Sequence, residues 1–199
     1  MISAALIVIA AYLLGSVSFA VVVSKAFELP DPHEYGSGNP GATNVLRTGN
    51  KVAALLTLAG DGGKGWLAVF LAEMTGQAMG APDWVVPAAA LAVFLGHIYP
   101  VFHNFAGGKG VSTAAGIVYA LHWQLGLALM VVWLAMALGF RISSLAALTA
   151  AVLMPLGGFY FFGNSPKAWA LVVIGALLFW RHRANIRQLM DGNEKAIGR

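Results

Sequence analysis

Long runs of hydrophobic residues separated by short polar inserts extend from the first residue to about residue 180. The runs are continuous rather than alternating, as is typical of membrane-spanning helices and not of membrane β-barrels. The segments expected to be helical are 1–24, 51–79, 85–100, two within 111–139 that divide near 121–124, 145–162 and 168–180. The pattern predicts an all-α transmembrane bundle of about seven spans in a single domain, 1–199. Several runs are shorter than the roughly 20 residues that a bilayer core requires, so five or six spans is the alternative.

The second run contains a charged, glycine-rich segment, Gly60–Gly65. We expect a kink there, because glycine weakens helices. Asp61 and Lys64 lie within this segment, and charged groups inside a membrane are costly unless they are paired. We therefore predict that these two residues form an ion pair at the kink.

Composition supports a membrane protein. Hydrophobic residues make up 59% of the chain and charged residues only 10%, against roughly a quarter charged in soluble domains. The absence of cysteine excludes disulfides, iron–sulfur clusters and thiolate nucleophiles. The first run is too long for a signal peptide and lacks a basic leader, so we expect it to be a retained span.

The basic residues lie mainly on one side of the predicted membrane. With seven crossings, the inserts 25–50, 101–110, 141–144 and 181–199 share a side, and ten of the twelve basic residues fall there. These ten are Lys25, Arg47, Lys51, Lys109, Arg141, Arg181, Arg183, Arg187, Lys195 and Arg199. Because positive charge marks the cytoplasmic face, we predict an outside N-terminus and a cytoplasmic C-terminus.

The first polar insert contains the glycine-rich segment Gly36–Arg47. A loop of this composition can point successive backbone N–H groups into an anion-binding nest, and Arg47 supplies a planar cation suited to phosphate. Its neutral hydrogen-bonding side chains are Ser37, Asn39, Thr43 and Asn44. We predict an anion-binding loop; the alternative is an ordinary loop in which Arg47 anchors the next span.

A second glycine-rich segment, Gly107–Thr113, leads directly into an apolar run. Backbone N–H groups at a helix start, Lys109, and the hydroxyls of Ser112 and Thr113 suit a phosphate group. The spacing is not that of a Walker A loop, so nucleotide hydrolysis is not indicated. A simple capped turn is the alternative interpretation.

The third polar cluster follows the last apolar run. If the helix continues, His182 and Asn185 share one face, and so do Arg183 and Arg187. The two arginines are suited to anionic lipid headgroups, whereas neither His182 nor Asn185 is needed as an anchor. No carboxylates stand at ligand spacing, so we expect no metal and no cofactor, and magnesium-dependent nucleotide chemistry is disfavoured.

These segments carry a resemblance to a known family. Gly36–Arg47, Gly107–Thr113 and His182–Arg187 resemble the three signature motifs of the bacterial acyl-phosphate:glycerol-3-phosphate acyltransferases. Asp61–Gly65 also resembles a family element, and the order is kept over nearly the whole chain. Ser112 stands where alanine is also common in the family.

The resemblance implies transfer of an acyl group from acyl phosphate to the 1-hydroxyl of sn-glycerol-3-phosphate, giving 1-acyl-glycerol-3-phosphate and inorganic phosphate. The enzyme would work in the bacterial inner membrane with its site facing the cytoplasm. An enzyme that produces acyl phosphate would be coupled to it, and neither nucleic acid nor metal would take part.

By motif match, Ser37, Arg47 and Lys109 would hold the phosphate of glycerol-3-phosphate. The donor phosphate would lie near Gly41–Asn44 and Gly107–Gly108. Ser143, His182 and Asn185 would lie nearby, with either His182 or a substrate phosphate as the base. The alternative from another class is a transporter of a phosphorylated metabolite, although the sequence shows no internal repeat.

Overall fold

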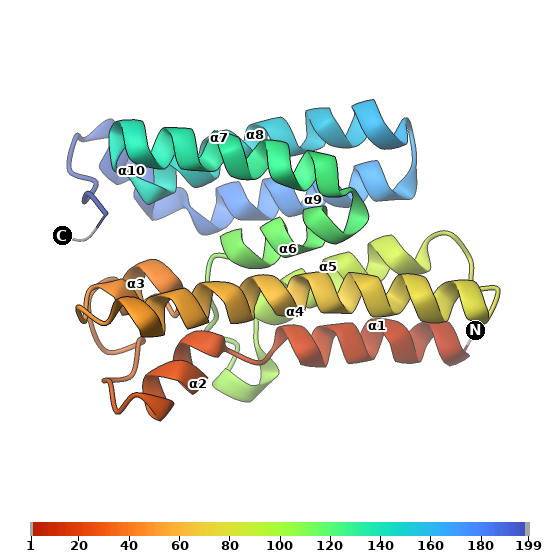
Figure 1. Ribbon diagram of the computed structural model, residues 1–199, viewed down its shortest axis with the longest axis horizontal. Helices are drawn as coiled ribbons and strands as arrows, with labels where there is room; N and C mark the ends of the chain where they lie inside the picture. The colour runs from red at the N-terminus through yellow and green to blue at the C-terminus, as the bar shows by residue number, and fades with distance from the viewer. Residues whose placement is uncertain (1, 198–199) are drawn as a thin grey trace.

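The computed structural model describes residues 2–197, and every regular element in this part of the chain is helical (Figure 1). The elements are α1 (Ile2–Gly15), α2 (Phe19–Ala26), α3 (Ala42–Leu46), α4 (Lys51–Ala78), α5 (Val85–Ile98), the 3-10 turn η1 (Val101–His103), α6 (Val111–Leu121), α7 (Trp123–Phe140), α8 (Ser143–Phe162), α9 (Pro166–Arg181) and α10 (Arg183–Met190). The predicted all-α class is confirmed for these residues. Arg199, counted above among the basic residues, lies outside them.

The long helices run back and forth along one common direction (Figure 1). Helices α1, α4 and α5 form one part of the bundle and α7, α8 and α9 form the other, with α6 between them. The short helices α2, α3 and α10 lie at one end of the bundle, and the first turn of α1 lies at the opposite end. The polar inserts are thereby gathered at one end, as the charge pattern predicts.

Three helical segments are long and apolar enough to cross a membrane: Val85–His103, α7 and α8. Together, α1 and α2 make a fourth if the bent pair is one span. Helices α6 and α9 have only 11 and 16 residues. The count of seven spans and the orientation of the termini therefore remain predictions.

The first apolar run is not one straight helix, contrary to expectation. Helices α1 and α2 meet at an angle of 43°. Ser18 begins α2 by accepting a hydrogen bond from the Val21 N–H, and such a cap favours a new helix start. Ser16 accepts a hydrogen bond from the backbone N–H of Val101, so the break also contacts η1.

The kink predicted in the second run is also wrong, because α4 is a continuous helix of 28 residues. Gly62 and Gly65 of this helix instead allow close packing against α6. A Cβ on Gly116 of α6 would collide with the carbonyl oxygen of Gly62. The Thr113 hydroxyl donates to the Asp61 carbonyl at 3.0 Å. Small residues let membrane helices approach closely in this way, and the many contacts with α6 keep α4 helical.

The predicted ion pair between Asp61 and Lys64 is confirmed. Lys64 Nζ lies 2.8 Å from Asp61 Oδ1, and both side chains are buried. The ammonium also donates to the Val17 carbonyl at 2.6 Å, and His97 Nδ1 of α5 lies 3.5 Å from Asp61 Oδ1. The pair thus joins α4 to the break after α1 and to α5.

Candidate active site

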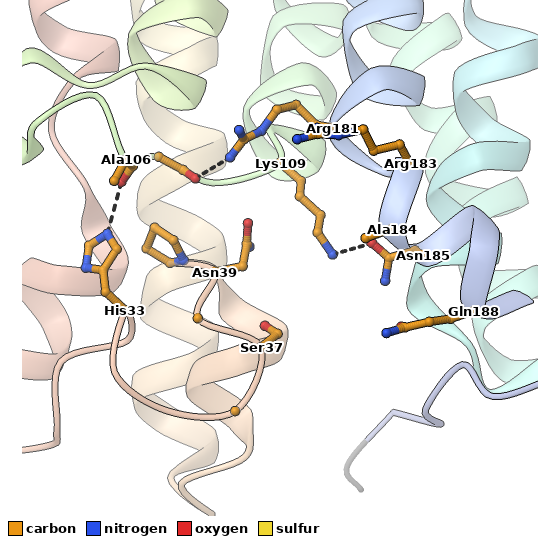
Figure 2. A pocket seen from close by; sticks show the side chains of 14 residues that line it. His33, Ser37, Asn39, Ala106, Lys109, Arg181, Arg183, Ala184, Asn185 and Gln188 are labelled. Carbon is orange, nitrogen blue, oxygen red and sulfur yellow. Dashed lines mark hydrogen bonds between the residues drawn. The ribbon is translucent and has the colours of Figure 1, made fainter.

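A pocket of about 660 Å³ opens at the end of the bundle where the polar inserts meet. Its walls come from the loop before α3, the loop before α6, and the junction of α9 with α10 (Figure 2). Its polar side chains are His33, Ser37, Asn39, Lys109, Arg181, Arg183, Asn185 and Gln188. Among the residues that the structure describes, no Asp or Glu lines it. The three motifs identified in the sequence therefore contribute to a single cationic cavity suited to an anion.

Lys109 links the second and third motifs across this pocket (Figure 2). Its Nζ donates a hydrogen bond of 2.7 Å to Asn185 Oδ1. Burial lowers the pKa of Lys109 from its ordinary value, and the nearby positive charge of Arg181 acts in the same direction. A bound phosphate would compensate for this loss of solvation by supplying negative charge.

Asn185 is held from its other side by Glu194. The amide Nδ2 of Asn185 donates to Glu194 Oε1 at 2.6 Å, and the Ser144 hydroxyl donates to the same oxygen at 2.6 Å. A carboxylate can only accept, so Asn185 must direct its NH₂ group to Glu194 and its oxygen to Lys109. The sequence reasoning missed Glu194, although it directly precedes Lys195 in the basic tail.

Arg181 lines the pocket, and the sequence reasoning did not place it in the site. Its Nε donates to the Gly108 carbonyl at 3.1 Å, and its Nη2 donates to the Gly107 carbonyl at 2.6 Å. The planar guanidinium is suited to such paired contacts. Arg181 thereby fixes the loop that carries Lys109. A basic residue at the end of an apolar run is typical of a membrane anchor, and this concealed its role.

Gly108 is required by close packing. A Cβ at this position would collide with Nε2 of His97, and the Gly108 N–H donates to the His97 carbonyl at 3.2 Å. Because His97 also lies beside Asp61, the buried ion pair and the pocket loop are connected through one side chain.

The first motif forms its own hydrogen-bonded loop around the buried side chain of Asn44. Asn44 Oδ1 accepts from the Ser37 N–H at 2.9 Å, and its Nδ2 donates to the carbonyls of Pro32 and Tyr35. Asn44 therefore shapes the loop that presents Ser37 and Asn39 to the pocket. The expected irregular loop is only half correct, since residues 42–46 form the short helix α3.

The predicted site residues divide into two groups. Those that line the pocket are Ser37, Asn39, Gly107, Lys109 and Asn185. Those that do not are Gly41, Thr43, Asn44, Arg47, Gly108, Ser112, Thr113, Ser143 and His182. Ser112 and Thr113 donate their hydroxyls to carbonyls of α4, and Ser143 begins α8. Substrate contacts for this second group remain predictions.

His182 is buried, with 2% of its surface exposed, and it interrupts the helix between α9 and α10. The condition that the helix continues through this residue, on which the shared face of His182 and Asn185 depended, is therefore not met. Its Nδ1 lies 2.8 Å from the Leu178 carbonyl, which can only accept, so Nδ1 carries the proton and Nε2 is left as an acceptor. Burial lowers the pKa of His182 to about 4, so the ring is neutral near pH 7.

An apolar groove of about 460 Å³ lies along α9, next to Tyr99, the residue that follows α5. Its lining residues are Tyr99, Val172, Val173, Ala176, Leu177 and Trp180. The Arg181 guanidinium carbon lies 5.9 Å from the centre of the Tyr99 ring, so this cation connects the groove to the polar pocket. Within residues 2–197, no group of three or more His, Asp or Glu side chains could hold a metal ion.

A helical membrane bundle with a cationic pocket next to an apolar groove defines a protein that handles anionic lipid precursors. Comparison with known families gives a match over residues 5–192 to the family described as glycerol-3-phosphate acyltransferase, and the chain belongs to this family. The resemblance inferred from the sequence is thereby confirmed, and the transport alternative finds no support.

Individual relatives agree. The glycerol-3-phosphate acyltransferase of Cupriavidus pinatubonensis is 59% identical over 193 residues, which cover 97% of this chain and 96% of that protein. The enzyme of the same name from Burkholderia ambifaria is 60% identical over 190 residues, covering 94% of this chain and 88% of that one.

A solved structure is also similar: the glycerol 3-phosphate form of PlsY (YgiH), described as an integral membrane glycerol 3-phosphate acyltransferase. It is 41% identical, with a TM-score of 0.91, and the match covers 98% of this chain and 96% of that one. The lysophosphatidic acid form of PlsY matches with a TM-score of 0.88 at 41% identity, covering 98% of this chain and 95% of that one.

Proposed function

We propose that this acyltransferase takes its acyl group from acyl phosphate and transfers it to the 1-hydroxyl of sn-glycerol-3-phosphate. The hydroxyl oxygen attacks the acyl carbon, and the bond from that carbon to the phosphate oxygen breaks. The hydroxyl proton leaves with the products, which are lysophosphatidic acid and inorganic phosphate. Each atom of the two substrates is then accounted for without a cofactor.

The observation that carries this proposal is the position of Arg181. This residue lines the polar pocket and lies over Tyr99, which lines the apolar groove. A phosphate headgroup in the pocket and an acyl tail in the groove would therefore meet at one cation. The relatives with solved structures are described with a phosphorylated glycerol and with its acylated product, which combine the same two chemistries.

The pocket is suited to phosphate rather than to a metal–nucleotide complex. Lys109, Arg181 and Arg183 supply positive charge, and no Asp or Glu lines the cavity to hold a magnesium ion. Ser37 and Lys109, assigned by motif to the glycerol-3-phosphate phosphate, face one another across it. The motif gives Arg47 the same assignment, although this residue does not line the cavity. The assignment is tested by Arg47→Lys, which replaces a bidentate guanidinium with a point charge. An unchanged KM for both substrates would contradict it.

Acyl phosphate is an activated mixed anhydride, so positioning and charge stabilisation can supply most of the rate enhancement. A covalent acyl-enzyme is unnecessary. The proton of the attacking hydroxyl can pass to a substrate phosphate, because both proposed substrates bring a phosphate group into the pocket. His182 is the rival base because its Nε2 is unprotonated, but it is buried and absent from the pocket lining. We favour the phosphate as base and assign His182 and Asn185 to positioning.

We also propose seven crossings, with the N-terminus outside and the pocket facing the cytoplasm of the bacterial inner membrane. Chain direction alternates between successive long helices, and the basic inserts are gathered at one end of the bundle (Figure 1). Acyl phosphate would reach the pocket from the cytoplasmic side, supplied by a coupled enzyme that produces it.

Donor choice is the experiment that tests this proposal. Purified enzyme is given labelled glycerol-3-phosphate with either acyl phosphate or acyl-CoA of the same chain length. We expect lysophosphatidic acid only with acyl phosphate. Product formation with acyl-CoA at an equal or higher rate would overturn the donor assignment.

A further inference from the structure

His33 belongs to the loop before α3 and lines the pocket without belonging to any of the three motifs. Its two ring nitrogens have different partners. Nδ1 lies 2.6 Å from Asp31 Oδ1, and Nε2 lies 3.0 Å from the Ala106 carbonyl oxygen of the second loop (Figure 2). The ring is only partly exposed, with 27% of its side-chain surface accessible.

Both partners can only accept hydrogen bonds. A carbonyl oxygen carries no proton. The backbone N–H of His33 donates to Asp31 Oδ1 at 2.9 Å and holds the pKa of Asp31 below its ordinary value, so this carboxyl is ionised. A neutral imidazole has one donor nitrogen and one acceptor nitrogen, so it can satisfy only one of these contacts. The doubly protonated ring satisfies both.

We infer that His33 is an imidazolium that ties the first loop to the second and adds a positive charge to the anion pocket. This inference rests on the proposed function, because it treats the pocket ligand as glycerol-3-phosphate. The charged and titratable groups around the ring are Asp31 on its own loop, His103 of η1, whose ring centre lies 6.3 Å away, and the cations that line the same pocket, Lys109, Arg181 and Arg183.

Loss of the proton has two consequences for the pocket. One ring nitrogen then points a lone pair at an acceptor, so either the contact with Asp31 or the contact with Ala106 is lost. The cavity also loses a positive charge next to Ser37 and Asn39. A side chain at position 33 that lacks the charge and the second donor should therefore bind an anion more weakly.

The test measures binding of glycerol-3-phosphate alone, by calorimetry on purified protein in detergent. His33→Gln removes the charge and cannot donate to both acceptors, and we expect its Kd to exceed that of the wild type by roughly tenfold, the scale of a hydrogen bond to a charged group. His33→Arg keeps a cation with several donors and should bind within about threefold of the wild type. His103→Gln, a control histidine outside the pocket lining, should follow the wild type.

A His33→Gln variant that binds like the wild type, or a His33→Arg variant that binds as weakly as His33→Gln, would overturn this inference alone. Thermal unfolding of each variant verifies that it is folded. Absence of glycerol-3-phosphate binding by the folded wild type would overturn the proposed function, and the inference with it. The two failures are therefore distinguishable.

Discussion

The Lys109 ammonium donates a 2.7 Å hydrogen bond to Oδ1 of Asn185, which lies 76 residues further along the chain. This contact joins the loop before α6 to helix α10 across the pocket. Glu194 fixes the amide from its other side, and Ser144 donates to the same Glu194 oxygen. A hydrogen-bond network of these side chains therefore holds Lys109. The orientation of one amide therefore determines how the pocket lysine is held.

Asn185→Asp tests this hydrogen-bond network. The substitution replaces the NH₂ donor with an oxygen facing Glu194, and it places a negative charge beside the proposed phosphate site. Two carboxylates in contact repel, and loss of a hydrogen bond to a charged group costs about 1.5–3 kcal/mol. We expect kcat/KM for acyl transfer to fall by roughly 100-fold.

Asn164→Asp is the matched control for this prediction. Asn164 is exposed in the turn before α9, at the opposite end of the bundle. Its substitution should leave kcat/KM within about twofold of the wild type, as is usual for surface changes. Equal kinetics for Asn185→Asp and the wild type would contradict the role of the Lys109–Asn185 contact.

Alanine substitutions at two glycines, one packed between α4 and α6 and one open to space, should have different effects on stability. A Cβ on Gly116 would collide with the Gly62 carbonyl, whereas a Cβ on Gly63 would meet nothing within 4 Å. Gly116→Ala should therefore lower the thermal midpoint, because α6 must move away from α4. Gly63→Ala should be neutral or stabilising, since alanine is favoured over glycine in a helix by about 1 kcal/mol. Unfolding in detergent checks both, and equal midpoints would contradict the packing assigned to α4 and α6.

The buried His182 predicts a pH dependence of stability. Its pKa is lowered to about 4 in the folded protein, from about 6.5 in an unfolded chain. Between these values the unfolded state binds more protons, so stability falls as pH is lowered from about 6.5 to about 4. The full effect is on the order of 3 kcal/mol.

His182→Asn checks the source of this dependence. Asparagine can still donate to the Leu178 carbonyl but does not titrate. The wild type should lose more thermal stability than this variant when pH is lowered from about 6.5 to about 4. Parallel losses in the two proteins would show that His182 is not the group responsible.

The orientation of the bundle is accessible to labelling because the chain contains no cysteine. Single cysteines at exposed positions report the two ends: Glu34→Cys and Lys195→Cys at the pocket end, and Asp83→Cys in the turn between α4 and α5. In intact cells, a membrane-impermeant maleimide should modify only Asp83→Cys. Modification of Glu34→Cys or Lys195→Cys under the same conditions would contradict the cytoplasmic location of the pocket.

The sequence was sufficient for the class of fold and for part of the candidate pocket, because each depends on local patterns. Apolar runs predicted the long helices, and the glycine-rich motifs predicted the loops that supply Ser37, Gly107 and Lys109 to the pocket. The buried ion pair of Asp61 with Lys64 was also predictable, since paired charges are expected in a membrane segment.

The errors and omissions come from contacts between distant segments. Helix α4 stays continuous because α6 packs against its glycines. Arg181 belongs to the site because it binds two carbonyls more than 70 residues away. Glu194 belongs to it because Asn185 and Ser144 converge on one oxygen. None of these relationships leaves a periodic signal in the sequence.

Acceptor-dependent phosphate release tests the central claim most directly. Purified protein is incubated with acyl phosphate, with and without glycerol-3-phosphate, and inorganic phosphate and lysophosphatidic acid are both measured. We predict phosphate release that requires glycerol-3-phosphate and equals the lysophosphatidic acid formed, and that is lost in a folded Lys109→Met variant. Phosphate release that does not depend on glycerol-3-phosphate, or full activity in Lys109→Met, would contradict it.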